Sequence, residues 1–183
     1  MKKTVVLFCF IVIYLASFAV NVYAQVAEGV WQFPRAIKTY IQPGHRNTER
    51  MKRAFAEWTR KTNQKIIFKY VSSKNVADIR VTFVKKIDNA NSHELDRAIG
   101  LARVYSNGSK TRIRKADIYI ADLTQDGRTL SNDEVYTTML HEIGHALGLN
   151  HVTQQESIMY PMADVRLEIS KYDIKQLYDR YGW

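Results

Sequence analysis

The chain has 183 residues and an excess of positive charge, with 27 lysines and arginines against 18 acidic residues, and it contains a single cysteine. One cysteine excludes an internal disulfide framework and a metal site built from several thiolates. The basic residues are spread along the chain without a tight block or a recognisable nucleic-acid motif. Their charge therefore favours, at most, an association with anionic surfaces and not a nucleic-acid-binding function.

The N-terminus has the pattern of a secretory signal peptide. Two lysines precede an apolar run over residues 5–20, and Val22 and Ala24 place small side chains at the positions read for cleavage. The alternative is an uncleaved membrane anchor, because a run of this length could just cross a bilayer. We expect a signal peptide over 1–24, and a single secreted or periplasmic domain over 25–183 that has no thiol.

Five short runs rich in β-branched and aromatic residues predict strands. They cover residues 37–41, 66–70, 79–84, 99–105 and 116–121. The polar stretch 85–98 is expected to be a long surface loop. Asn107-Gly108 and Asp126-Gly127 are dipeptides typical of tight turns.

Three helices are predicted between and after these strands. Apolar residues at helical spacing predict the first over residues 49–62. Ser131 with Glu134, and Ser170 with Asp173, have the spacing of a capping box, in which the two side chains bond reciprocally to main-chain N–H groups at a helix start. These pairs predict where the second and third helices begin, and the whole pattern indicates a mixed α/β fold.

Three of the five histidines lie in the segment 141–151, which reads His-Glu-Ile-Gly-His-Ala-Leu-Gly-Leu-Asn-His. On the second helix, His141 and His145 are one turn apart on the same face, so their ring nitrogens can meet at one zinc ion. Glu142 lies beside them. Its carboxylate can deprotonate a water molecule at the metal, which makes it the candidate general base for peptide hydrolysis.

Gly148 and His151 make this segment far more specific. Two histidines at this spacing are compatible with a solvated helical face, but the longer pattern is too rare to be coincidental in a chain of this size. Glycine can adopt the left-handed conformation that ends a helix, so the chain can turn back and bring His151 to the metal. Three imidazoles would leave a fourth position open for water and substrate, which is typical of a catalytic zinc site.

This segment resembles the extended zinc motif of the metzincin metallopeptidases, in which a methionine-containing turn follows beneath the metal. Here that turn would be residues 157–161, Ser-Ile-Met-Tyr-Pro, with Met159 as its methionine. Astacin-like and serralysin-like members have tyrosine at the position of Pro161, so the turn is similar to the matrixin branch. The similarity continues in matrixin order along nearly the whole mature chain, at Phe55, Trp58, Ala77-Asp78-Ile79, Leu101-Ala102, Asp117-Ile118 and Leu177-Tyr178.

The resemblance implies a metzincin-like fold. Its elements are a twisted, mostly parallel five-stranded sheet, an active-site helix, and a smaller C-terminal part that holds His151 and the last helix. It also implies that Met159 forms an apolar floor under the zinc without binding it.

The resemblance also implies where a substrate binds. The main chain near Leu101 and Ala102 is expected to pair with an extended peptide as an added strand. Tyr160, Pro161 and Met162 are expected to line a pocket that prefers an apolar side chain just after the cut bond. Protein or peptide substrates and a monomeric enzyme follow from the same resemblance.

Several residues depart from the pattern of animal matrixins. Arg103 and Ile120 stand at histidine positions of a second, structural zinc, so we expect that zinc to be absent. Asp122, Asp126 and Asp133 do not match a recognised calcium spacing, so turn formation explains them better and calcium binding is left open.

Two further points concern the remaining residues and latency. His45 and His93 are expected to be solvated surface histidines. A mature chain without cysteine cannot use the family's usual inhibitory thiolate, so the enzyme is exported active, or Glu28 or another non-thiol group covers the metal.

Two other functions are weighed against a general endopeptidase. One is a zinc-bearing adhesion module, against which the intact Glu142 argues. The other is a processing enzyme or toxin with one partner, which the sequence does not separate from broad proteolysis.

Overall fold

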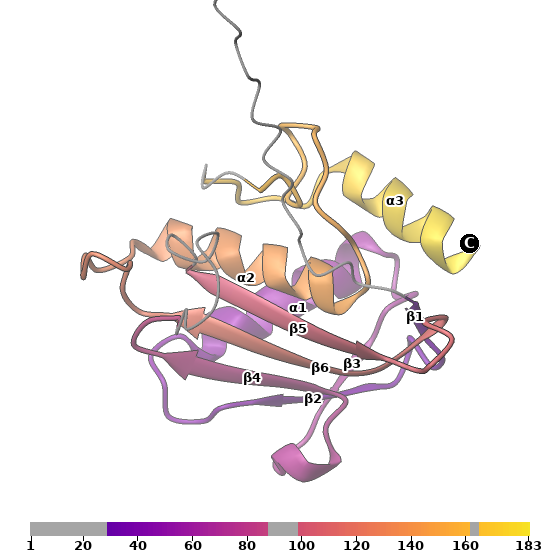
Figure 1. Cartoon of the computed structure of the whole chain (residues 1–183), viewed down its shortest axis with the longest axis horizontal. Coiled ribbons are helices and arrows are strands. Elements are labelled where there is room, and N and C mark those ends of the chain that lie inside the picture. The colour runs from indigo at the N-terminus through magenta and orange to yellow at the C-terminus, as the bar shows by residue number, and fades with distance from the viewer. Residues whose placement is uncertain (1–28, 88–98, 162–164) are drawn as a thin grey trace, which may run out of the picture.

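The computed structural model describes residues 29–87, 99–161 and 165–183, which form one twisted sheet and three α-helices (Figure 1). The strands are β1 (Val30–Trp31), β2 (Ile37–Ile41), β3 (Phe68–Tyr70), β4 (Ile79–Val84), β5 (Gly100–Ser106) and β6 (Arg112–Ala121). The helices are α1 (Thr48–Lys61), α2 (Asn132–Ala146) and α3 (Lys171–Tyr181), with a short 3₁₀ turn, η1 (Lys74–Val76). The predicted mixed α/β class and all five predicted strands are confirmed.

The sheet is mostly parallel, as predicted. β3, β2, β4 and β6 follow one another in parallel register, β1 joins the start of β6 in parallel, and β5 pairs with β6 antiparallel. The sheet has six strands instead of the expected five, because β1 is an additional strand of only two residues and is too short to produce a sequence pattern. β6 begins at Arg112, four residues before the predicted start at 116, because its basic first residues pair with β1 and β5.

One face of the sheet packs against α1 and α2. Alternation in β4 buries Ile79, Val81 and Phe83, as the period-two pattern requires. The two helices are joined to each other where the indole N–H of Trp58 donates to the carbonyl of Leu140 at 3.0 Å. α2 is therefore fixed both to the sheet and to α1.

α3 closes the C-terminal part of the molecule. Its predicted capping box is present, with the Ser170 hydroxyl and the Asp173 carboxylate each bonded to the other's N–H. The Tyr181 hydroxyl donates to the carbonyl of Leu147 at 3.1 Å, which ties α3 to the end of α2. The chain between the two helices has no regular element in its described part, and it carries the third histidine and the methionine turn.

Some sequence predictions fall outside the described residues. These are the signal peptide over 1–24, Glu28, most of the loop 85–98 with His93, and Met162. In the part of the chain that is described, no helix is long and apolar enough to cross a membrane.

Candidate metal centre

The active-site helix α2 begins and ends at defined caps. Ser131 and Glu134 form the predicted capping box at its start. At its end, the N–H of Gly148 donates to the carbonyl of His145 and the N–H of Leu149 to that of Gly144, both at 2.9 Å. These are the two bonds of a Schellman motif, and Gly148 has the left-handed φ of +97° that the motif requires. The predicted exit from the helix at this glycine is confirmed.

This turn brings His151 back to the two histidines of α2. The Nε2 atoms of His141 and His145 lie 3.0 Å apart, those of His141 and His151 3.0 Å, and those of His145 and His151 3.1 Å. No other cluster of histidines, cysteines and carboxylates suited to a metal ion occurs among the described residues. The three imidazoles therefore converge from two different segments of the chain.

The second ring nitrogen of two of these histidines is held by main chain. Nδ1 of His141 is 2.7 Å from the carbonyl oxygen of Ile158, and Nδ1 of His145 is 2.9 Å from that of Leu149. A carbonyl oxygen only accepts, so both Nδ1 atoms carry the proton and both Nε2 atoms present lone pairs. Nδ1 of His151 is buried and has no partner among the described residues.

Electrostatics favour neutral rings at this site. Burial lowers the pKa of His141 to about 4, and it also lowers the pKa values of His145 and His151. Neutral Nε2 lone pairs about 3 Å apart repel one another unless a cation lies among them. The donor set and its tautomers thus fit a zinc ion, which commonly binds three imidazoles and keeps one position open.

Glu142 projects from α2 toward β5. Its side chain is buried, and the N–H of Ala102 donates to its carboxylate. Burial raises the pKa of Glu142 to about 8, and the bond from Ala102 opposes that shift. β5 can approach this closely only because residue 100 is glycine, since a Cβ there would lie 2.6 Å from Oε1 of Glu142.

The methionine turn lies against the same helix. Met159 is buried, and its sulfur packs so tightly on Gly144 that any Cβ at that position would collide with it. The carboxylate of Asp173 accepts from the hydroxyl of Ser157 and from the N–H of Ile158. Met159 therefore packs against α2, and a buried carboxylate from α3 holds the turn that carries it.

β5 presents an edge to the centre. Among the described residues it pairs only with β6, and the N–H of Ala121 donates to the carbonyl of Ile99. Hydrogen bonding alternates along an antiparallel pair, so the main chain of Leu101 faces β6, whereas those of Gly100, Ala102 and Val104 face the edge. Of the two residues expected to pair with a peptide, Ala102 has the required orientation and Leu101 does not.

The described residues of the expected substrate pocket are the last two of the methionine turn. Tyr160 is partly buried and Pro161 is exposed. The guanidinium of Arg166 lies 5.0 Å from the ring centre of Tyr160.

A separate cavity of about 490 Å³ lies among His151, Met159 and α3. Neither Glu142 nor β5 lines that cavity, so we do not treat it as the substrate cleft.

Two residues at expected ligand positions of a second zinc have other surroundings. Arg103 is exposed on β5, with its guanidinium 5.6 Å from the ring centre of Tyr119, and Ile120 is buried in the core. Neither side chain can bind zinc.

The expectation of a solvated His45 is wrong. Its ring stacks on Phe83 with 4.1 Å between ring centres, and its Nε2 lies 3.1 Å from the Asp122 carboxylate. Arg46 donates to the same carboxylate at 3.0 Å, so Asp122 joins two parts of the chain and does more than form a turn. Asp126 accepts from the Thr124 hydroxyl within its turn, as expected.

Comparison with known proteins agrees with this geometry. The sequence profile of the matrixin family matches residues 31–182, which is most of the chain. The chain belongs to the matrixin family. Two curated plant relatives are metalloendoproteinase 2-MMP of Arabidopsis thaliana, with 29% identity over 167 residues, and metalloendoproteinase 1 of Glycine max, with 30% over 137.

A third relative of this matrixin is the interstitial collagenase of Oryctolagus cuniculus, with 29% identity over 135 residues. The alignments cover 85%, 71% and 72% of this matrixin, and 43%, 44% and 27% of the three relatives in the same order. The aligned part of this matrixin therefore spans less than half of each relative's length.

Sequence reasoning missed two residues that shape this centre. Gly100 gave no signal, because a glycine at the start of a strand is unremarkable until α2 is packed against it. Asp173 was recognised only as a helix cap. Its contact with the methionine turn joins residues 15 positions apart, and no local pattern reports such a contact.

Proposed function

We propose that this matrixin is an exported zinc-dependent endopeptidase, with a signal peptide over 1–24 and its catalytic domain over 25–183. The observation that supports the proposal is the convergence of three Nε2 atoms within 3.1 Å, next to the buried Glu142 on the same helix. His141, His145 and His151 would hold one zinc ion. When bound, zinc supplies Lewis-acid chemistry that makes a water molecule more acidic and a peptide carbonyl more electrophilic.

Glu142 moves the protons of the reaction. Its carboxylate takes a proton from the attacking water molecule and gives it to the nitrogen of the departing amine. Because water is the attacking group, no covalent intermediate with the protein forms. The N–H of Ala102 favours the ionised form of this carboxylate against the effect of burial, and the positive charge of a bound zinc ion would favour it further. The close packing at Gly100 restricts the same side chain.

Substrate binding follows from the edge of β5. An extended peptide can add to this edge through the outward main-chain groups near Ala102, and main-chain pairing does not depend on the substrate's sequence. Tyr160, Pro161 and Met162 are proposed to line the pocket for the side chain after the cut bond. We therefore propose protein or peptide substrates. As the resemblance and the signal-peptide pattern imply, we also propose a monomeric enzyme in a secreted or periplasmic location.

Two variants test the assignment. Glu142→Ala should keep one zinc per chain and lose peptide hydrolysis by a factor of about 100 or more, because it removes the general base and none of the ligands. His145→Ala should lose both zinc and hydrolysis. Retained hydrolysis in a Glu142→Ala preparation of verified sequence would overturn the role of this residue.

A peptide library digested with and without a zinc chelator separates the alternatives. Many related cleavage sites that disappear with the chelator support a general endopeptidase. One site supports a dedicated processing enzyme, and no cleavage by zinc-loaded protein supports the binding module.

A further inference from the structure

The face of the sheet that is turned away from α1 and α2 is rich in cations. Alternation along the strands places Ile79, Val81 and Ile118 inward, so their strand neighbours point outward. The outward basic residues of the described strands, which we call the basic face, are Lys38, Lys69, Arg80, Arg103 and Lys115. The outward acidic residues are Asp78, just before β4, and Asp117, so positive charge exceeds negative charge across the whole sheet.

Part of this arrangement is unfavourable for the stability of the sheet, although Nζ of Lys115 pairs with the Asp117 carboxylate at 2.6 Å. Lys38 and Lys69 are direct partners on neighbouring strands, and both are exposed. Like charges at such positions repel each other. Arg80 lies in the middle of the face, and its Nε is buried without a hydrogen-bond partner among the described residues. Residues that reduce stability without a structural gain are expected where a surface has a function.

Tyrosine rings on this face hold two of the cations. The guanidinium of Arg103 lies 5.6 Å from the ring centre of Tyr119, and Nζ of Lys115 lies 5.0 Å from that of Tyr105. These contacts hold the charges against the sheet. Each ring therefore already has a cation beside it, which leaves it a poorer platform for stacking nucleic-acid bases.

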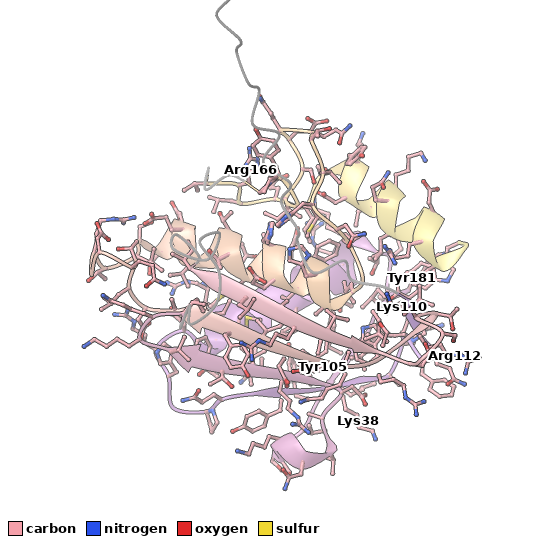
Figure 2. The ribbon with its side chains drawn as sticks, viewed as in Figure 1. Lys38, Tyr105, Lys110, Arg112, Arg166 and Tyr181 are labelled. Atoms are coloured by element: carbon pink, nitrogen blue, oxygen red, sulfur yellow. The ribbon has the colours of Figure 1, made fainter. Side chains whose placement is uncertain are left out.

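The basic face continues into the turn between β5 and β6. Arg112 and Arg114 are exposed at the start of β6. Figure 2 shows Lys38, Tyr105 and Arg112 in the lower and right-hand parts of the view, over the sheet and its turn, whereas Arg166 lies near the top. The charge thus extends from β3 across the sheet to its turn, and it is separate from the methionine-turn side of the molecule.

We infer that the basic face binds an anionic linear polysaccharide. A broad array of separated cations suits a flexible polyanion that makes contacts through charge alone. Duplex DNA is a poorer fit because no helix or ribbon projects from this face to enter a groove. A lipid surface is a poorer fit because the most exposed large apolar side chains, Phe33 and Val76, are not outward residues of these strands, and Tyr105 is the one exposed aromatic side chain among the described outward residues.

The position of Arg103 connects this face with the metal centre. It directly follows Ala102, whose N–H bonds Glu142, but its side chain points to the outer side of the sheet. A polymer on the basic face would therefore lie beside the peptide-binding edge without covering it. The enzyme would be held at a polysaccharide matrix and would cleave proteins embedded there.

Binding is tested with a fluorescent heparin oligosaccharide, by anisotropy at an ionic strength of about 0.15 M. The test variant is Lys38→Gln/Lys69→Gln/Arg103→Gln. The control is Arg53→Gln/Lys171→Gln/Lys175→Gln, which removes the same charge from exposed positions on α1 and α3. Thermal unfolding checks that all proteins are folded. Because binding needs no hydrolysis, the result is independent of the proposed peptidase activity.

We expect the test variant to raise the Kd for heparin about tenfold or more and to flatten its salt dependence, with less than about a twofold change in the control. Equal losses in both variants would show a nonspecific effect of net charge and would overturn the assignment. Absence of heparin binding by the wild type would overturn it too. Tighter binding of a single-stranded DNA oligomer or of phosphatidylserine vesicles than of heparin would reject a polysaccharide as the partner.

Discussion

The carboxylate of Asp173 accepts the main-chain N–H of Ile158 at 3.1 Å, and the carbonyl of Ile158 holds Nδ1 of His141 at 2.7 Å. A residue on α3 thereby orients a proposed zinc ligand on α2 without touching it. The same carboxylate accepts from the hydroxyls of Ser157 and Ser170 and from the N–H of Ser170. It is thus a buried carboxylate whose surroundings donate hydrogen bonds to it.

Asp173→Asn should therefore weaken both the fold and the metal centre. The amide keeps one acceptor oxygen but turns donor hydrogens toward groups that also donate. We expect a loss of about 2–4 kcal/mol in the free energy of unfolding, and a zinc affinity reduced about tenfold or more. Urea unfolding and competition with a zinc chelator measure the two effects. Asp179→Asn is the control, since this residue lies on the same helix but is exposed and pairs with Lys175; an equal loss in both variants would contradict the role of Asp173.

Gly100→Ala should separate activity from zinc binding. The new Cβ would lie 2.6 Å from Oε1 of Glu142, so either β5 or the carboxylate must move, whereas no histidine ligand is touched. We expect kcat/KM to fall about tenfold or more with zinc still bound at one ion per chain. Gly108→Ala is the matched control on the following turn, where an added Cβ meets nothing within 4 Å. Unchanged activity in Gly100→Ala would show that this close contact does not position Glu142.

The helices and the convergence of the three histidines could be predicted from sequence because they depend on local patterns. Capping boxes at Ser131 and Ser170 act over three residues, and His141, His145 and Gly148 act within one or two turns of a helix. The surroundings of His45 could not be predicted, since its partner Asp122 is 77 positions away. The orientation of Leu101 could not be predicted for a different reason, because strand residues alternate in the direction of their main-chain groups and only the pairing with β6 sets the phase.

Glu134 should make the stability of α2 depend on pH. Bonds from the Arg128 side chain and the Ser131 N–H lower the pKa of this carboxyl to about 2, from an ordinary value of 4.5. A lowered pKa means that the folded state favours the ionised form, so the stabilisation is complete above about pH 4.5 and is lost as the pH falls toward 2.

Glu134→Gln should consequently cost about 1 kcal/mol at pH 7, and this difference from wild type should shrink at pH 3.5. Urea unfolding of both proteins at the two pH values measures it. Glu168→Gln, at a glutamate whose side chain is 84% exposed, should change neither value. A difference that stays constant with pH would mean that Glu134 acts through packing and not through its charge.

Gly148→Ala should disturb the metal centre, and a second glycine offers a matched comparison. Gly148 and Gly182 both end helices with left-handed φ values, +97° and +69°. A Cβ at Gly148 would also lie 2.8 Å from the carbonyl oxygen of Gly29, whereas one at Gly182 would meet nothing within 4 Å. Both alanines bear the backbone cost of about 1 kcal/mol, but only Gly148→Ala must shift the turn that delivers His151. We expect Gly148→Ala to lose about tenfold or more in zinc affinity and Gly182→Ala to keep wild-type affinity at a slightly lower Tm. Equal zinc affinities in the two variants would show that the turn tolerates the side chain and that His151 reaches the metal by some other constraint.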